Sequence, residues 1–129
     1  MFSSEEERES DKIGQLLNAL LQCSPDRISA WIDAHQPHLN LHFLQTLKDS
    51  YAITSYILAE PNKAERATRY GLLIAEQMVD EQLALPLARW ARGMYEMFHA
   101  PEKAIELFQQ AQVAYQAVGN ELVVAFLNV

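Results

Sequence analysis

The chain contains few of the residues that form disulfides, end helices or make tight turns. Its 129 residues include one cysteine, four glycines and five prolines. A single cysteine cannot close a disulfide within the chain, which excludes a small disulfide-stapled fold and favours a reducing compartment. β-Sandwiches and barrels need a turn roughly every 8–12 residues and would use more glycine and proline, so these folds are excluded as well.

Long hydrophobic runs are also missing. No window approaches the roughly 18 consecutive apolar residues of a membrane span. The first residues, Ser3–Glu9, are acidic, whereas a signal peptide begins with positive charge and continues with an apolar stretch. We therefore expect a cytoplasmic protein with no export signal and no membrane partner.

Positive charge is in the minority, because 10 Lys and Arg stand against 17 Asp and Glu, for a net charge of −7. Proteins that bind nucleic acids carry a basic surface that neutralises phosphates. The one candidate for such a surface is a set of four arginines, which we interpret as parts of solvated helix faces: Arg66, Arg69, Arg89 and Arg92. The sequence predicts no nucleic-acid partner.

What the chain does contain is an apolar content of 50%, with 21% charged residues, which fits one folded domain. Its apolar residues recur at intervals of three and four, which predicts amphipathic helices. Seven segments follow this pattern: 13–21, 28–32, 41–58, 64–78, 87–98, 104–118 and 120–127. No segment shows the alternation of a half-buried strand, so the sequence predicts an all-α fold.

Three prolines mark expected helix starts. Pro25, Pro61 and Pro101 each suit the first turn of a helix, where a missing N–H costs nothing. Ser24 would cap the first of these helices.

Other prolines and a glycine bear on where helices end or bend. Pro37 should stop a helix, and Gly119 predicts a helix end followed by a new helix. Pro86 predicts either a kink or a helix that begins near Leu85.

The sequence also contains an internal repeat. The motif PNKA at 61–64 recurs as PEKA at 101–104. Repeats of about 40 residues are typical of stacked helical hairpins, and short connections predict antiparallel neighbours. In the second copy, small Ala104 and Ala111 flank large Phe108 at helical spacing, which lets paired helices approach closely.

The pattern Ala104-x3-Phe108-x2-Ala111, with Tyr95 upstream, resembles the second half of a tetratricopeptide repeat. The run 111–125 resembles the long-helix variety, similar to that of kinesin light chains and of bacterial multidomain signalling proteins.

The segment 16–25, followed by 31–35, resembles the leader that precedes the repeats in such bacterial proteins. There the repeats commonly accompany a caspase-like peptidase of the CHAT type or a nucleotide-binding regulatory module.

The resemblance implies about six to seven helices, in antiparallel hairpins stacked as a right-handed solenoid. It implies a helical leader or cap over 1–38, a first hairpin over 39–80, a second over 81–119, and the start of a third, incomplete repeat over 120–129. Because repeat arrays usually need three or more units and a polar cap, we interpret the chain as the front piece of a longer protein.

In such a solenoid, the first helix of each hairpin lines a concave groove. The resemblance implies that six residues line a groove for a protein or peptide: Asp49, Ile53, Tyr56, Arg89, Gly93 and Glu96. Arginine and tyrosine often anchor interfaces, and Gly93 would let a peptide approach the backbone. Arg92 and Gly93 stand where the family has a single glycine. We therefore expect a protein-binding scaffold or adaptor in signalling.

Motifs for bond chemistry are missing. The glycines are isolated, so there is no phosphate-binding loop, and there is no serine-nucleophile elbow. His35, His38 and His42 are spaced by three and four, but Pro37 interrupts the helix that would present them, and nothing completes a tetrahedral site. The sequence predicts no enzymatic activity, no catalytic residue, no cofactor and no metal.

Two alternatives stay open. In one, the chain is the regulatory front end of an enzyme such as a caspase-like protease. In the other, it is a self-association module, in which Leu122, Phe126 and Leu127 pair between chains to form a homodimer.

Overall fold

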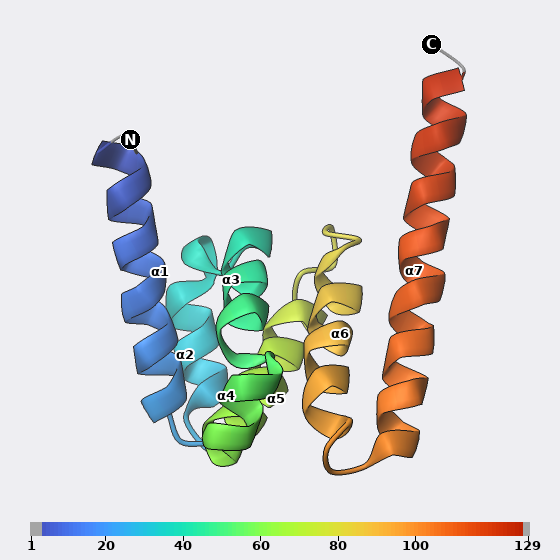
Figure 1. Ribbon diagram of the computed structural model, residues 1–129. Helices are drawn as coiled ribbons and strands as arrows, with labels where there is room; N and C mark the ends of the chain where they lie inside the picture. Colours follow the sequence, from blue (N-terminus) through green and yellow to red (C-terminus); the bar gives the residue numbers. More distant parts are fainter. Residues whose placement is uncertain (1–3, 128–129) are drawn as a thin grey trace.

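A computed structural model of the chain shows a row of helices (Figure 1). It describes the backbone of residues 4–127 and the side chains of residues 8–119. The elements are α1 (Ser4–Gln22), α2 (Ile28–His35), a 3-10 turn η1 (Gln36–His38), α3 (Leu41–Tyr51), α4 (Thr54–Ala59), α5 (Pro61–Glu76), α6 (Ala84–Glu96) and α7 (Pro101–Leu127). The predicted all-α class is confirmed, since residues 4–127 form no strand. No helix in this range is long and apolar enough to cross a membrane.

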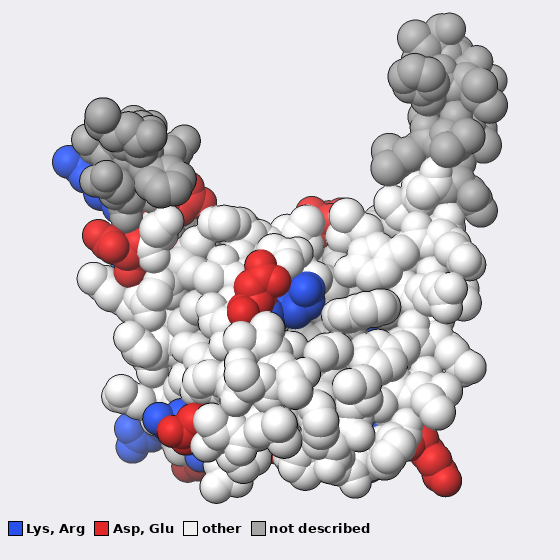
Figure 2. Space-filling model, in the orientation of Figure 1, with Lys and Arg blue, Asp and Glu red and all other residues white. Residues whose placement is uncertain are grey.

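The helices follow one another in space nearly as they do in sequence. α1 and α7 stand at the two ends of the row (Figure 1), and α6 contacts α3 and α5 on one side and α7 on the other. The ribbons of α1 and α7 extend beyond the shorter helices between them (Figure 1). Among the described residues, most of the face seen in Figure 2 carries no charged side chain.

The core lies among α1, α2, α3, α5 and α6. Its largest fully buried side chains include Tyr70, Phe43 and Leu20. α7 adds a narrow strip to the buried residues, with Ala104 and Ala111 against α6. α7 is therefore attached mainly through α6.

Three prolines lie in first turns. α5 begins at Pro61 and α7 at Pro101, as the repeated motif predicts. α6 begins at Ala84, which places Pro86 third in the helix and confirms the start near Leu85. The first N–H groups of a helix have no partner within it, so no hydrogen bond is lost at these positions.

The predicted start of α2 at Pro25 is wrong. Residues 25–27 form a turn, in which the N–H of Arg27 donates to the carbonyl of Ser24 (3.0 Å). The helix begins at Ile28, and no side chain caps it. It ends before Pro37, as predicted.

The helix predicted over 41–58 is divided into α3 and α4 at Ala52 and Ile53. The segment 50–55 is rich in serine, threonine, isoleucine and tyrosine, which are weaker helix formers than alanine or leucine. The break allows Ala52 and Ile57 both to be buried.

The predicted helix end at Gly119 is also wrong. α7 runs without a break for 27 residues through Gly119, and no described glycine has the positive φ that commonly ends a helix. The division into repeats stays a prediction. The side chains of Leu122, Phe126 and Leu127 lie outside the described residues, so the predicted homodimer contact does too.

Candidate functional site

α6 and α7 pack closely because Gly93 leaves room for an aromatic ring. A Cβ atom at Gly93 would lie 2.6 Å from a ring carbon of Phe108, closer than real atoms approach. The ring of Phe108 also packs against Trp90, with 5.0 Å between ring centroids. The prediction that Gly93 leaves its backbone open to a partner is wrong, because Phe108 of the same chain fills this space.

A hollow of about 410 Å³ lies where α3, α6 and α7 meet, and we call it the three-helix groove. It is lined by Gln45, Lys48, Leu87, Trp90 and Tyr115. Trp90 is 39% exposed and Tyr115 is 36% exposed, whereas Leu87 is buried. The groove therefore combines an apolar base and two accessible aromatic rings with a polar edge from α3.

Asp49 completes this polar edge. Its carboxylate accepts a hydrogen bond from Nε2 of Gln45 (3.0 Å) and pairs with Nζ of Lys48 (3.3 Å). Asp49 thus contacts two residues that line the groove. The pairing leaves the edge of the groove nearly neutral.

Three other predicted groove residues lie elsewhere. Ile53 is 43% exposed and immediately precedes α4, and Tyr56 on α4 packs edge-on against Tyr51, with ring centroids 5.1 Å apart. Arg89 lines a separate hollow of about 460 Å³, the other residues of which come from α7. The structure does not bring these three residues together with the three-helix groove.

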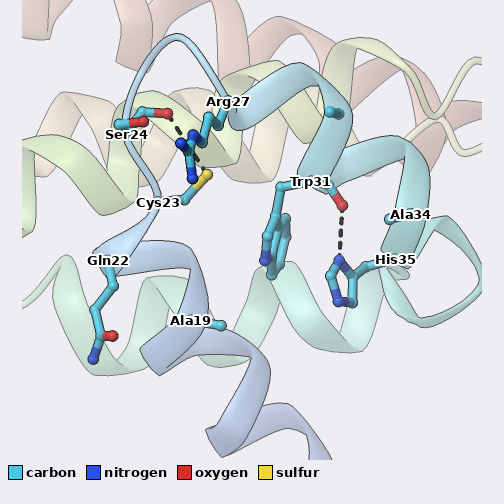
Figure 3. Close-up of a pocket in the computed structure, with 9 residues that line it drawn as sticks. Ala19, Gln22, Cys23, Ser24, Arg27, Trp31, Ala34 and His35 are labelled. Atoms are coloured by element: carbon cyan, nitrogen blue, oxygen red, sulfur yellow. Dashed lines mark hydrogen bonds between the residues drawn. The ribbon is translucent and has the colours of Figure 1, made fainter.

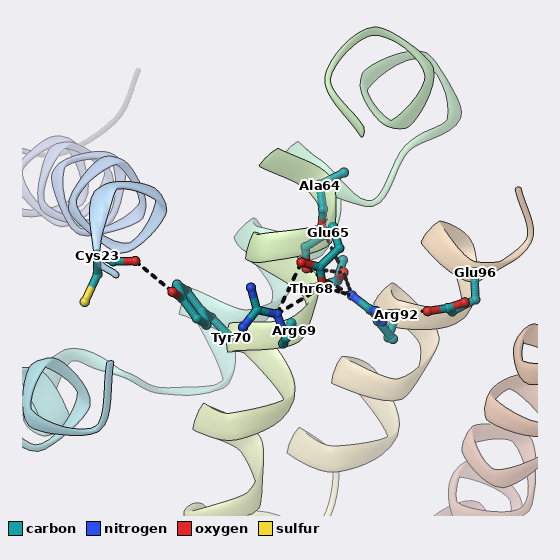
Figure 4. Close-up of polar contacts among 8 residues, drawn as sticks. All are labelled: Cys23, Ala64, Glu65, Thr68, Arg69, Tyr70, Arg92 and Glu96. Atoms are coloured by element: carbon teal, nitrogen blue, oxygen red, sulfur yellow. Dashed lines mark hydrogen bonds and ion pairs between the residues drawn. The ribbon is translucent and has the colours of Figure 1, made fainter. Parts of the chain in front are cut away.

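The sixth predicted residue, Glu96, belongs to a cluster of ion pairs between α5 and α6 (Figure 4). It is 8% exposed, and its Oε1 lies 2.9 Å from Nη2 of Arg92. Nη1 of Arg92 donates to the Glu65 carboxylate (2.8 Å) and to the hydroxyl of Thr68 (3.2 Å). Nε of Arg69 donates to the same carboxylate (3.0 Å). Glu96 is therefore engaged within the chain, and its predicted place on an open groove is wrong.

The environment of Glu65 favours its charged form. Burial raises the pKa of this carboxyl, but the hydrogen bonds and positive charges of Arg69 and Arg92 together outweigh burial and hold the pKa below its usual value. The cluster therefore keeps its negative centre at neutral pH and ties α5 to α6.

Most of the arginines considered as a basic surface have partners within the chain. Besides Arg69 and Arg92, Arg66 donates from Nη1 to the carbonyl of Leu21 (2.9 Å) and so ties α5 to α1. Their interpretation as merely solvated residues is wrong for these three. Only Arg89 of the four lacks an ion pair or hydrogen bond among the described side chains, which removes the basis for a basic patch.

A second candidate site is a hollow of about 590 Å³ between the end of α1 and α2, which we call the α1–α2 cleft (Figure 3). It is lined by Ala19, Gln22, Cys23, Ser24, Arg27, Ala30, Trp31, Ala34 and His35. The hydroxyl of buried Tyr70 donates to the carbonyl of Cys23 (2.7 Å), which fixes one wall to α5. Residues 8–119 hold no cluster suited to a metal ion, and His35, His38 and His42 form none.

The sequence prediction missed both aromatic residues of the three-helix groove. These residues lie in the segments 87–98 and 104–118, for which the apolar spacing predicts only amphipathic helices. One signal was available, because α6 has more large apolar residues than one buried stripe can hold: Leu85, Leu87, Trp90, Met94 and Tyr95. Some of these had to be exposed.

Comparisons with protein-family models, curated proteins and solved structures found no match for this chain. The resemblance to tetratricopeptide repeats therefore rests on the residues themselves and stays a prediction. The fold and the groove define an all-α protein with accessible aromatic residues between helices from different parts of the chain.

Proposed function

We propose that the chain is a protein–protein interaction module of the tetratricopeptide type, which binds an apolar segment of a partner in the three-helix groove. The observation that carries this proposal is the exposure of Trp90 and Tyr115 around one hollow. Aromatic side chains contribute large contact areas and often dominate binding energy. Exposed apolar residues that line a groove are typical of interaction sites.

The arrangement of helices supports the stacked-hairpin part of the proposal. α6 contacts both α3 and α5, and α7 contacts α6. This is the order expected when a hairpin of α6 and α7 stacks on one of α3 and α5, each repeat touching its neighbour. α5 and α7 also begin with the two copies of the repeated motif.

The packing of Gly93 explains why the groove differs from the predicted one. We assign the role of the family's small residue to Gly93 rather than Arg92, because Phe108 packs against Gly93. This moves the register of α6 by one residue. The position that would face a partner then passes from Arg89 to Trp90, which does line the groove.

The chemistry of the groove indicates what its partner carries. Lys48 and Asp49 neutralise each other at the edge, so a strongly charged segment gains little there. Leu87, Trp90 and Tyr115 favour aliphatic or aromatic side chains. We expect a short segment with one or two large apolar residues to bind.

The proposal is tested by selecting peptides from a displayed random library on the folded chain and measuring their dissociation constants by fluorescence anisotropy. Tyr115→Ser should weaken binding by about tenfold or more, because it removes one of the two accessible aromatic rings of the groove. Leu58→Ser and Val79→Ser are matched controls, because these residues are 64% and 85% exposed and lie outside the groove. A library that yields no binder, or binders equally sensitive to the control changes, contradicts the proposal.

A further inference from the structure

The α1–α2 cleft offers chemistry that the proposed function does not use. Its walls present a guanidinium group, an indole ring, an imidazole ring and the only thiol of the sequence, from Arg27, Trp31, His35 and Cys23. The three-helix groove lies on α3, α6 and α7 and shares no lining residue with this cleft. The two sites can therefore be tested independently.

Small residues give the cleft its room. Ala19 on α1 and Ala30 and Ala34 on α2 line it, and the open volume is about 590 Å³. Sites for small molecules commonly measure roughly 300–1,000 Å³ and combine an apolar surface with a few polar groups. The cleft has both the volume and the mixed lining of such a site.

Trp31 forms a preformed aromatic wall. It packs against the hydrophobic core and stacks on His35, with 4.3 Å between ring centroids and an angle of 29° between planes. Nδ1 of His35 lies 2.8 Å from the carbonyl oxygen of Trp31, which fixes the imidazole (Figure 3). The other side of the indole faces the space toward Cys23 and Gln22, so a planar ring can stack there.

Arg27 supplies the charge. It immediately precedes α2 and lines the cleft, and no ion pair forms with it among the described residues. A guanidinium group binds carboxylate, sulfonate or phosphate through paired hydrogen bonds. No acidic residue lines the cleft.

We propose that the α1–α2 cleft binds a small aromatic anion, whose ring stacks on Trp31 and whose acidic group pairs with Arg27. The net charge of −7 opposes an anion at long range, so the affinity depends on the local contacts with Arg27 and Trp31. The thiol of Cys23 lies beside the bound ring and reports its presence.

The requirement for charge is tested with two dyes that differ in one group. 8-Anilinonaphthalene-1-sulfonate carries a sulfonate, and N-phenyl-1-naphthylamine has the same rings without it. We expect the sulfonate to bind with one-to-one stoichiometry and the neutral dye to bind about tenfold more weakly, the usual effect of one charge-assisted contact. Equal binding of both dyes, or no binding of the sulfonate at millimolar concentration, overturns the proposal.

Two variants test the place of binding. Arg27→Gln should weaken the sulfonate dye about tenfold, and the matched change Arg89→Gln should leave it unchanged, since Arg89 lies in a different hollow. Ala30→Leu should block the cleft while preserving the helix, because Ala30 is exposed and leucine is a good helix former. Undiminished binding to either cleft variant overturns the proposal.

Cys23 gives a direct readout of occupancy. Its rate of reaction with 5,5′-dithiobis(2-nitrobenzoate) should fall several-fold at a saturating concentration of the sulfonate dye, and Ala30→Leu should remove this protection. A reaction rate that the dye does not change shows that the dye binds elsewhere and contradicts the assignment.

Discussion

The ring of Phe108 on α7 occupies the space that a side chain at Gly93 on α6 would need. The glycine is therefore required by a contact within the chain, and the contact sets the register of the two helices. It also places Trp90, which packs against Phe108, at the surface of the three-helix groove.

Gly93→Ala should destabilise the fold although it removes a glycine from a helix. Alanine is favoured there by about 1 kcal/mol, but its Cβ would displace Phe108, and overpacking costs roughly 1–3 kcal/mol. We expect a net loss of about 1 kcal/mol in urea unfolding. Adding Phe108→Leu to Gly93→Ala should make the loss smaller than the sum of the single changes. A stabilised Gly93→Ala variant would show that the ring moves freely.

Gly119→Ala should stabilise the chain by about 0.5–1 kcal/mol. A Cβ at Gly119 meets no atom within 4 Å, and the residue lies inside α7. Gly14→Ala in α1 is the matched control, since it has the same open surroundings, and should show a similar gain. If Gly119 instead ended the helix with a positive φ, alanine would lower the thermal unfolding temperature.

Glu65→Gln should reduce stability in a pH-dependent way. The pKa of Glu65 in the folded chain lies below its usual value of 4.5 because the contributions of Arg69 and Arg92 outweigh burial. The stability that this carboxylate contributes is therefore present above the pKa of the unfolded chain and is lost as the pH falls through the folded pKa. We expect a loss of about 1–2 kcal/mol at pH 7.

The measurement is urea unfolding of both proteins over a range of pH. The difference in the free energy of unfolding between the unchanged chain and Glu65→Gln should shrink below about pH 4.5. Glu106→Gln serves as control, because Glu106 is exposed on α7. A difference that does not depend on pH would assign the effect of Glu65→Gln to lost packing.

Arg92→Met should destabilise the chain more than any other single arginine change discussed here. It leaves the buried carboxylate of Glu96 without its partner, and breaking a buried pair costs about 3–5 kcal/mol. Because Arg92 keeps 18% of its side-chain surface exposed, we expect the lower end. Combining Arg92→Met with Glu96→Gln should recover part of the lost stability. The control Arg89→Met should change the free energy of unfolding by less than about 0.5 kcal/mol in the same urea titration.

Prolines in the sequence predicted the starts of two helices correctly. Pro61 and Pro101 marked the starts of α5 and α7, because proline fits a first turn. The prediction of a helix end at Gly119 was wrong, because glycine is compatible with both a helix interior and a helix end. Only the backbone angle φ distinguishes the two. The break between α3 and α4 depends on packing of Ala52 and Ile57, which spacing alone does not encode.

The candidate site was harder to predict because it depends on register and on distant contacts. The pairs of Arg69 with Glu65 and of Arg92 with Glu96 have helical i, i+4 spacing and are visible in the sequence. The contact of Arg92 with Glu65 joins two helices, so the spacing of these residues in the sequence does not reveal it. Arg89 and its neighbour Trp90 line different hollows, because a helix turns by about 100° per residue.

The most direct test of the proposed interaction module is the NMR signal of the two indole N–H groups during titration with a selected peptide. The sequence has two tryptophans, of which Trp90 lines the three-helix groove and Trp31 the α1–α2 cleft. Trp90→Phe and Trp31→Phe assign the two signals. We predict that the peptide shifts the signal of Trp90 and leaves that of Trp31 in place. A peptide that shifts the Trp31 signal alone, or neither signal, would contradict binding in the three-helix groove.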